Sequence, residues 1–198
     1  MGIEAKAFEM PKGVTDFVAQ LSQIRDFGAQ YVVFQTVSSP AALALKNAQS
    51  LGMNDVTFVC LNWCADENLV NLAGGAAEGA IGAFPFTPPS VDVPGMKDAK
   101  DYLSKKGDSL EKKGVHYIQG WWTMATMVEG IRKTMAAGKE VKGENIKAAL
   151  ETLKNFDTGG VTVPITFTPS DHRGSKGLRL FKVENGKWVQ MTDYRYVK

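Results

Sequence analysis

Histidine and cysteine are scarce in this 198-residue sequence, which has two of each. A closed zinc site needs four such ligands, and Cys60 and Cys64 lie far along the chain from His116 and His172, so we expect no metal. Two cysteines also provide no disulfide framework. Cys60 lies in an apolar run, where a free cysteine usually acts as a small buried hydrophobe.

Long apolar runs and charge of one sign are missing as well. No stretch approaches the roughly 20 apolar residues that span a bilayer, so we expect no membrane segment. Residues 1–6 do not resemble a secretory signal, so an exported parent would have its signal outside this chain. The net charge of +2 comes from 23 basic and 21 acidic residues without a polybasic block, which argues against nucleic acid as a partner.

The motifs of common enzymes are absent too. No Gly-x-Ser-x-Gly elbow and no paired acid accompany His172, so we expect no catalysis from it. Gly74-Gly75 lacks the lysine of a phosphate loop, and no Gly-x-Gly-x-x-Gly follows a strand. We therefore predict a binding module without a cofactor, not an enzyme.

The first half of the chain alternates strand and helix signals, which predicts an α/β fold with a parallel sheet. Tyr31–Phe34 is a continuous β-prone run, typical of a strand buried on both faces. Ser39-Pro40 has the features of a helix start, with serine as the cap and proline at the first helical position. The expected strands are 5–10, 31–34, 56–61 and 79–84, and the expected helices are 14–27, 39–51 and 66–73.

The second half begins with helical patterns and ends with strand patterns. Helices are expected at 97–106, 117–137 and 143–153, and strands at 161–163, 165–167, 178–183 and 188–191. Trp121 and Trp122 lie in a helix that is apolar on several sides, so we expect them to pack in the core. Asn185-Gly186 predicts a tight hairpin, because both residues tolerate positive φ.

Several motifs in this order resemble one known family. They are Gly13-Val14-Thr15-Asp16-Phe17, Tyr31-Val32-Val33-Phe34, Ala73-Gly74-Gly75-Ala76-Ala77-Glu78-Gly79, Gly159-Gly160-Val161 and Phe167-Thr168-Pro169. Together they resemble the type I periplasmic solute-binding proteins of branched-chain amino acid ABC transporters. Asp171-His172-Arg173-Gly174-Ser175 also resembles a segment of branches that take aromatic or other carboxylated compounds.

The resemblance implies two α/β lobes around a cleft, with the chain crossing the hinge three times. It assigns residues 1–92 to the second lobe, 93–157 to a helical part of the first lobe, and 158–198 to strands returning to the second lobe. Most of the first lobe has no counterpart, so we expect a truncated member with weak solute affinity, an uncovered face on the helix 117–137, and self-association. The full-length parent is expected to be periplasmic and to deliver solute to a membrane permease. A ligand-sensing receptor or regulatory domain of the same fold is the alternative.

Ligands of open α/β sheets lie beyond the carboxyl ends of the strands. Two loops qualify there, and they supply the candidate ligand-binding residues Gln35, Thr36, Val37, Ser38, Asn62 and Trp63. By resemblance, amino-acid-binding relatives have an aromatic residue near Val37 and an acidic residue near Asn62, and this sequence has neither. A buried ammonium without an anionic partner is costly, so we expect an aromatic or other small organic acid or an amino acid derivative. Trp63 could instead cover the edge of the core, and Thr36 and Ser38 could cap their own loop.

Overall fold

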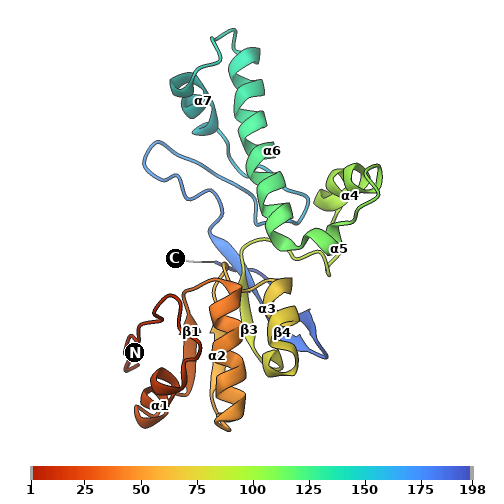
Figure 1. The fold of residues 1–198 in the computed structure, drawn as a ribbon. Helices are drawn as coiled ribbons and strands as arrows, with labels where there is room; N and C mark the ends of the chain where they lie inside the picture. The colour runs from red at the N-terminus through yellow and green to blue at the C-terminus, as the bar shows by residue number, and fades with distance from the viewer. Residues whose placement is uncertain (1, 197–198) are drawn as a thin grey trace. The chain divides into compact units, whose positions relative to one another are not determined.

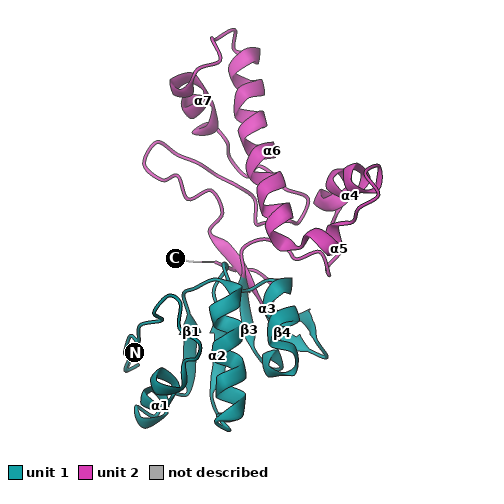
Figure 2. Cartoon of the chain, in the orientation of Figure 1, with its two compact units in different colours: residues 1–83, 181–189 teal, residues 84–180, 190–198 magenta. Residues whose placement is uncertain are grey.

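The computed structural model describes residues 2–196, which form two compact units (Figure 2). Unit 1 consists of residues 1–83 and 181–189, and unit 2 of residues 84–180 and 190–198. The chain passes from one unit to the other after Ala83, Leu180 and Val189.

The sheet that organises unit 1 has the neighbour order β1 (Tyr31–Phe34), β2 (Thr57–Cys60), β3 (Ile81–Phe84), β4 (Gly177–Glu184), β5 (Lys187–Gln190) (Figure 1). β1 pairs with β2, and β2 with β3, in parallel. The predicted parallel α/β fold is therefore confirmed. β4 and β5 are joined across Asn185 and Gly186, whose φ values of 52° and 70° are those that the Asn-Gly pair predicted.

Three helices pack with this sheet: α1 (Val18–Asp26), α2 (Ser38–Ser50) and α3 (Glu67–Ala73), the last followed by a 3₁₀ turn, η1 (Gly74–Ala77). α2 contacts both α1 and α3. Small side chains make this close approach possible, since Ala41, Ala44 and Ala48 of α2 are all buried. The rings of Phe34 and Phe58 stack with centroids 5.7 Å apart, which joins β1 to β2 in the core.

Three expectations for unit 1 are wrong. Residues 5–10 form no strand, because none of residues 2–10 makes a backbone hydrogen bond with another described residue. β1 is not buried on both faces: Tyr31 is 66% and Val33 58% exposed, and these alternate side chains point to the same face of the sheet. Within the described residues β1 is also the edge strand, since it pairs only with β2. Finally, α2 begins at Ser38 with Val37 as its cap, so Pro40 is the third helical residue and not the first.

Unit 2 is built around helices: η2 (Pro94–Met96), α4 (Lys97–Ser104), α5 (Leu110–Lys113), α6 (Val115–Ala136) and α7 (Gly143–Leu150). Its core consists of Met96, Ala99, Leu103, Leu110, Ile118 and Val161. Trp121 and Trp122 pack against this core, and the indole N–H of Trp122 donates to the Gly95 carbonyl at 3.0 Å. The predicted core role of the two tryptophans is confirmed.

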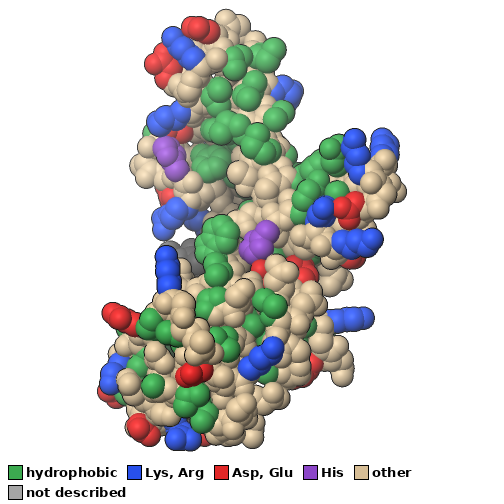
Figure 3. Space-filling model, in the orientation of Figure 1, with side chains coloured by type: hydrophobic (Ala, Val, Ile, Leu, Met, Phe, Trp, Pro, Cys, Tyr) green, Lys and Arg blue, Asp and Glu red, His purple; other side chains and the backbone are tan. Residues whose placement is uncertain are grey.

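α6 packs on α7 through Gly130, where a Cβ would come within 2.7 Å of the Leu150 side chain. Another face of α6 is apolar and exposed to solvent: the side chains of Met124, Val128 and Met135 are each more than half exposed. Figure 3 shows hydrophobic side chains along this part of the molecule. The uncovered face expected for the helix 117–137 is therefore present, while the expected self-association stays a prediction.

The strands expected at 161–163 and 165–167 do not form. This segment has only isolated bridges, Phe156 with Ile165 and Thr168 with Asp171. The Thr162 N–H donates to the Thr158 hydroxyl at 2.9 Å instead of to a neighbouring strand, and Pro164 has no N–H to donate. β6 (Arg195–Tyr196), which the sequence did not predict, pairs antiparallel with Gly177 and Leu178 of β4.

Arg179 joins several segments of unit 2 and is 9% exposed. Its Nη2 donates to the Gly160 carbonyl at 3.0 Å, to the Tyr194 hydroxyl at 2.8 Å and to the Thr87 hydroxyl. Its Nη1 donates to Gln190 Oε1 at 3.3 Å, and the guanidinium carbon lies 4.2 Å from the Tyr194 ring centroid. A buried charge is costly unless it is hydrogen-bonded, so the Arg179 guanidinium requires these partners. The contacts therefore hold together four segments, which contain Thr87, Gly160, Arg179 and residues 190–194.

Candidate functional site

The loops that follow β1 and β2 leave the sheet at the same edge. Phe34 and Cys60, the last residues of the two strands, are register partners in a parallel pair. The Leu61 N–H donates to the Phe34 carbonyl at 3.2 Å, and a main-chain hydrogen bond from Thr36 reaches the Cys64 sulfur. The structure therefore brings residues 35–38 and 62–63 together, and we call this group the rim.

The rim has both exposed and half-buried members. Val37 and Trp63 are each 57% exposed, and Gln35 is also exposed. Thr36 and Asn62 are half-buried. Trp63 gives the rim an exposed, flat apolar side chain, and Gln35 and Asn62 give it neutral hydrogen-bonding groups.

The N-terminus of α2 opens at the rim. The first amides of a helix have no partner inside the helix and attract anions, and α2 is 13 residues long. Ser38 and Ser39 offer such amides, whereas Pro40 has none. The first turn of α2 has no acidic side chain of its own, and the acidic group that reaches it is the Asp66 carboxylate, 2.6 Å from the Ser38 hydroxyl.

Ser38 also has a structural contact of its own. Its hydroxyl is buried and donates to Asp66 Oδ2 at 2.6 Å. The other carboxylate oxygen, Oδ1, accepts the Leu69 N–H at 2.8 Å and thereby caps α3. Trp188 Nε1 donates to the Asp66 carbonyl at 2.9 Å. The hydrogen bond between Ser38 and Asp66 ties the loop after β1 to the loop after β2.

Asp66 is a site residue that the sequence reasoning missed. It lies four positions after Asn62, and the sequence pattern placed it only as the first residue of the expected helix 66–73. At 2% exposure its carboxylate lies behind the rim and serves Ser38 and the α3 amides. A sequence signal for the contact would have been a Ser at the start of one helix and an Asp at the start of the next, because both helices begin at the same edge of the sheet.

Two thiols lie under the rim. Cys60 and Cys64 are free and fully buried, which confirms Cys60 as a buried hydrophobe. A hydrogen bond with Cys64, together with burial, raises the pKa of Cys60. The Cys64 sulfur lies 3.6 Å from the Phe34 carbonyl oxygen. Both thiols are therefore packing residues of the site's floor.

A groove of about 900 Å³ ends at this rim. It runs between residues 2–10 on one side and β1 on the other, and residues of α1 form its floor. Gln35 and Thr36 belong to both the groove and the rim. The site is therefore open along the uncovered edge of β1.

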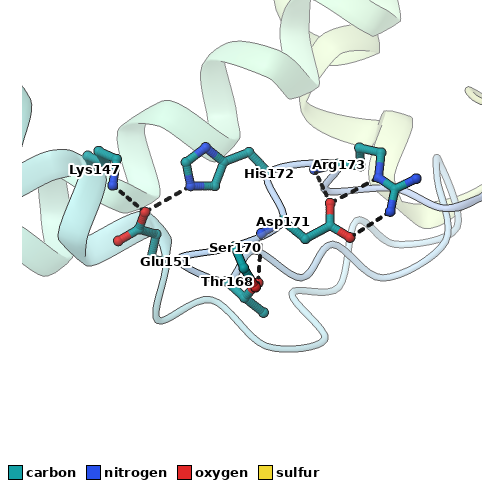
Figure 4. Close-up of polar contacts among 7 residues, drawn as sticks. All are labelled: Lys147, Glu151, Thr168, Ser170, Asp171, His172 and Arg173. Carbon is teal, nitrogen blue, oxygen red and sulfur yellow. Dashed lines mark hydrogen bonds and ion pairs between the residues drawn. The ribbon is translucent and has the colours of Figure 1, made fainter.

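A separate polar cluster lies in unit 2, in the loop after residue 167 (Figure 4). His172 Nε2 lies 2.8 Å from Glu151, which also pairs with Lys147 at 2.5 Å. Contacts with Arg173 and Lys176 hold the pKa of Asp171 well below its usual range. Figure 4 shows two separate groups of contacts, Lys147 and His172 around Glu151, and Arg173 on Asp171.

Residues 2–196 contain no group of three or more His, Cys, Asp or Glu side chains that could hold a metal ion. None of the helices among them is both long enough and apolar enough to cross a membrane.

Comparison with known proteins identifies the family. A family profile described as periplasmic binding protein matches residues 1–187, which is most of the chain. The chain belongs to the periplasmic binding protein family. The resemblance found in the sequence motifs is thereby confirmed.

Relatives of this periplasmic binding protein are components of ABC transporters. A branched-chain amino acid ABC transporter structure from Thermus thermophilus with bound valine is 30% identical, with a TM-score of 0.86 over 96% of this chain and 52% of that one. The leucine-, isoleucine-, valine-, threonine-, and alanine-binding protein of Pseudomonas aeruginosa is 26% identical over 79% of this chain and 44% of its own length. A solute-binding protein from R. palustris in complex with 4-hydroxybenzoate shares the fold, at 20% identity and a TM-score of 0.75, over 96% of this chain and 51% of that one. The chain thus spans about half the length of these relatives.

Proposed function

We propose that the rim is one wall of the solute site of a periplasmic importer component, and that its solute is an aromatic or other small organic acid or an amino acid derivative. The full protein would present this solute to an ABC-transporter permease. The observation that carries the proposal is the juxtaposition of the α2 N-terminus, Thr36, Asn62 and Trp63 at one sheet edge. No bond of the solute is broken.

Each end of the solute has a matching group. The α2 amides suit a carboxylate, which valine and 4-hydroxybenzoate both carry. The exposed Trp63 suits a flat or apolar body, and Asn62 suits a neutral polar group. Neither loop has an acidic side chain before Asp66, and Asp66 is buried and bonded to Ser38, so the ammonium of a plain amino acid lacks an accessible partner here.

The chain spans only about half of its relatives, which bears on affinity. In the binding assay below, the 198-residue chain is used by itself, without the further chain length of its relatives, so we expect weak binding, with dissociation constants in roughly the millimolar range. In the complete protein, differential binding to the closed state would drive closure of the two lobes.

The test is isothermal calorimetry of the chain with 4-hydroxybenzoate and with valine, supported by thermal shift. We expect binding of 4-hydroxybenzoate and weaker binding of valine. Trp63→Ala should weaken binding at least about tenfold, which corresponds to about 1.4 kcal/mol, and Trp63→Phe should retain most of it. Tyr102→Ala removes an exposed aromatic in unit 2 and is the matched control. Equal loss in Trp63→Ala and Tyr102→Ala, or tighter binding of valine, would contradict the proposal.

A further inference from the structure

Two thiols are in contact below the rim. Cys60 is the last residue of β2, and the chain turns back directly after it: the N–H groups of Cys64 and Ala65 both donate to the Leu61 carbonyl at 3.0 Å. This turn brings the Cys64 sulfur into hydrogen-bonding contact with the Cys60 sulfur. Both cysteines are free and fully buried, so the two sulfurs meet in a place shielded from solvent.

The two cysteines lie on either side of the rim residues that follow β2. Asn62 and Trp63 are two of the three residues between Cys60 and Cys64. Trp63 is 57% exposed, so packing holds its indole only in part. A covalent bond between the two sulfurs would close a ring of five residues, 60–64, that contains both of these rim residues.

We propose that Cys60 and Cys64 form an intramolecular disulfide, and that this bond holds the loop 61–65 in the conformation that binds solute. The chain belongs to the periplasmic binding protein family, and disulfides form and persist in the bacterial periplasm. In the reduced chain the two thiols are packing residues, and in the oxidised chain they are a crosslink. The effect on solute binding rests on the proposed function, whereas the bond itself does not.

The bond forms by thiol–disulfide exchange, with a disulfide compound as the oxidant. Cys64 is the attacking group, because the hydrogen bond from Cys60 and the main-chain N–H of Thr36 lower its pKa, although burial opposes them. Its thiolate displaces one thiol from the oxidant and forms a mixed disulfide. The Cys60 thiol then loses its proton and attacks the Cys64 sulfur, which closes the ring and releases the second thiol. The two cysteines lose two electrons and two protons, and the oxidant gains them as two thiols.

Burial decides when this reaction occurs. Both cysteines are 0% exposed, so an oxidant cannot reach either sulfur while the loop 61–65 keeps this conformation. The bond therefore forms as the chain folds, before the loop closes over the sulfurs, or when the loop opens locally. A chain that is already folded and reduced should react slowly with the oxidant, and a chain refolded in its presence should react completely.

The ring restricts the rim loop before any solute binds. Without the bond, the loop can open when the N–H groups of Cys64 and Ala65 leave the Leu61 carbonyl. With the bond, its two ends stay together. A loop that is ordered in advance loses less conformational entropy on binding, so the bridged chain should bind 4-hydroxybenzoate at least about threefold more tightly than the reduced chain.

The test refolds the full 198-residue chain with oxidised glutathione and, in parallel, with dithiothreitol. Free thiols are alkylated after unfolding and counted by mass spectrometry. We expect the oxidised chain to take up no alkyl group and to be two hydrogen atoms lighter than the reduced chain before alkylation. The amides of Asn62 and Trp63 should exchange more slowly in the bridged chain, and calorimetry should give the tighter binding of 4-hydroxybenzoate.

Two single variants are the controls. Cys60→Ala and Cys64→Ala each keep one thiol and cannot close the ring, so the amides of Asn62 and Trp63 should exchange in both variants as they do in the reduced natural chain. The comparison of the oxidised and reduced natural chain needs no substitution, so it remains valid if either variant folds poorly.

Three results would overturn the proposal: two alkylated thiols after refolding with oxidised glutathione, glutathione adducts or linked dimers in place of the internal bond, or equal exchange of the rim amides and equal solute affinity in the bridged and reduced chains. If the bond forms and protects the loop but neither form takes 4-hydroxybenzoate or valine, the disulfide stands and the proposed solute site fails. If the chain binds solute while both thiols stay free, the reverse holds.

Discussion

The bond between Ser38 and Asp66 offers a sharp test of how the rim is held in place. Both side chains are buried, and the hydroxyl oxygen lies 2.6 Å from Asp66 Oδ2. A hydrogen bond to a charged group contributes about 1.5–3 kcal/mol net. Ser38→Ala removes this bond, while the Leu69 N–H still serves the other carboxylate oxygen. We therefore expect unit 1 to lose about 2 kcal/mol of stability.

The measurement is hydrogen exchange of the β1 and β2 amides, because it reports on unit 1 by itself. A loss of about 2 kcal/mol corresponds to roughly thirtyfold faster exchange. Ser39→Ala is the matched control: Ser39 is the exposed neighbour in the same helical turn, and the variant gains the same helix propensity. Its exchange should change little. Equal exchange in the two variants would refute the anchoring role of Ser38.

Three further predictions concern other parts of the chain. Arg179→Met removes the donor to the Thr87 and Tyr194 hydroxyls, while the Gly160 carbonyl keeps these two hydroxyls as its donors, so urea unfolding of unit 2 should show a loss of about 1–3 kcal/mol; an unchanged midpoint would contradict this. Gly186→Val places a β-branched residue of unit 1 at φ 70°, which should cost roughly 1–3 kcal/mol in urea unfolding of unit 1, whereas Gly186→Asn should cost much less. Asp171 has a lowered pKa in the folded chain, so its ion pairs stabilise residues 168–176 above about pH 4 and are lost as the pH falls further. The protection factors of this loop's amides, which correct for the intrinsic pH dependence of exchange, should fall on acidification below about pH 4, less so in Asp171→Asn, and a fall in protection on a rise in pH would oppose this reasoning.

Local sequence patterns predicted much of the fold. The apolar strands 31–34 and 57–60 and the helices between them follow from side-chain type and spacing over a few residues. The hairpin at Asn185-Gly186 follows from the positive φ that both residues tolerate. The two rim loops could be placed at one edge because parallel strands end on the same side of a sheet.

The wrong predictions share a cause: they concern contacts with residues that are distant in the sequence. Residues 5–10 have a strand-like sequence but make no main-chain hydrogen bond with other described residues, and residues 165–167 donate to Phe156, Gly174 and Leu153 in turn without forming one continuous ladder. The exposure of Tyr31 and Val33 depends on what packs on their face of the sheet, and their own side chains do not specify this. The Ser38 contact with Asp66 joins residues 28 positions apart, beyond the range of helix-start signals.

The central claim is that residues 35–38 and 62–63 meet the solute. Chemical-shift mapping of the isotope-labelled chain during titration with 4-hydroxybenzoate tests it most directly. We predict that the largest shifts occur at the amides of Thr36, Ser38 and Ser39 and at the indole N–H of Trp63. Shifts centred on the hollow between α6 and α7, near Thr134 and Asn145, or no shifts up to saturating solute, would contradict the account.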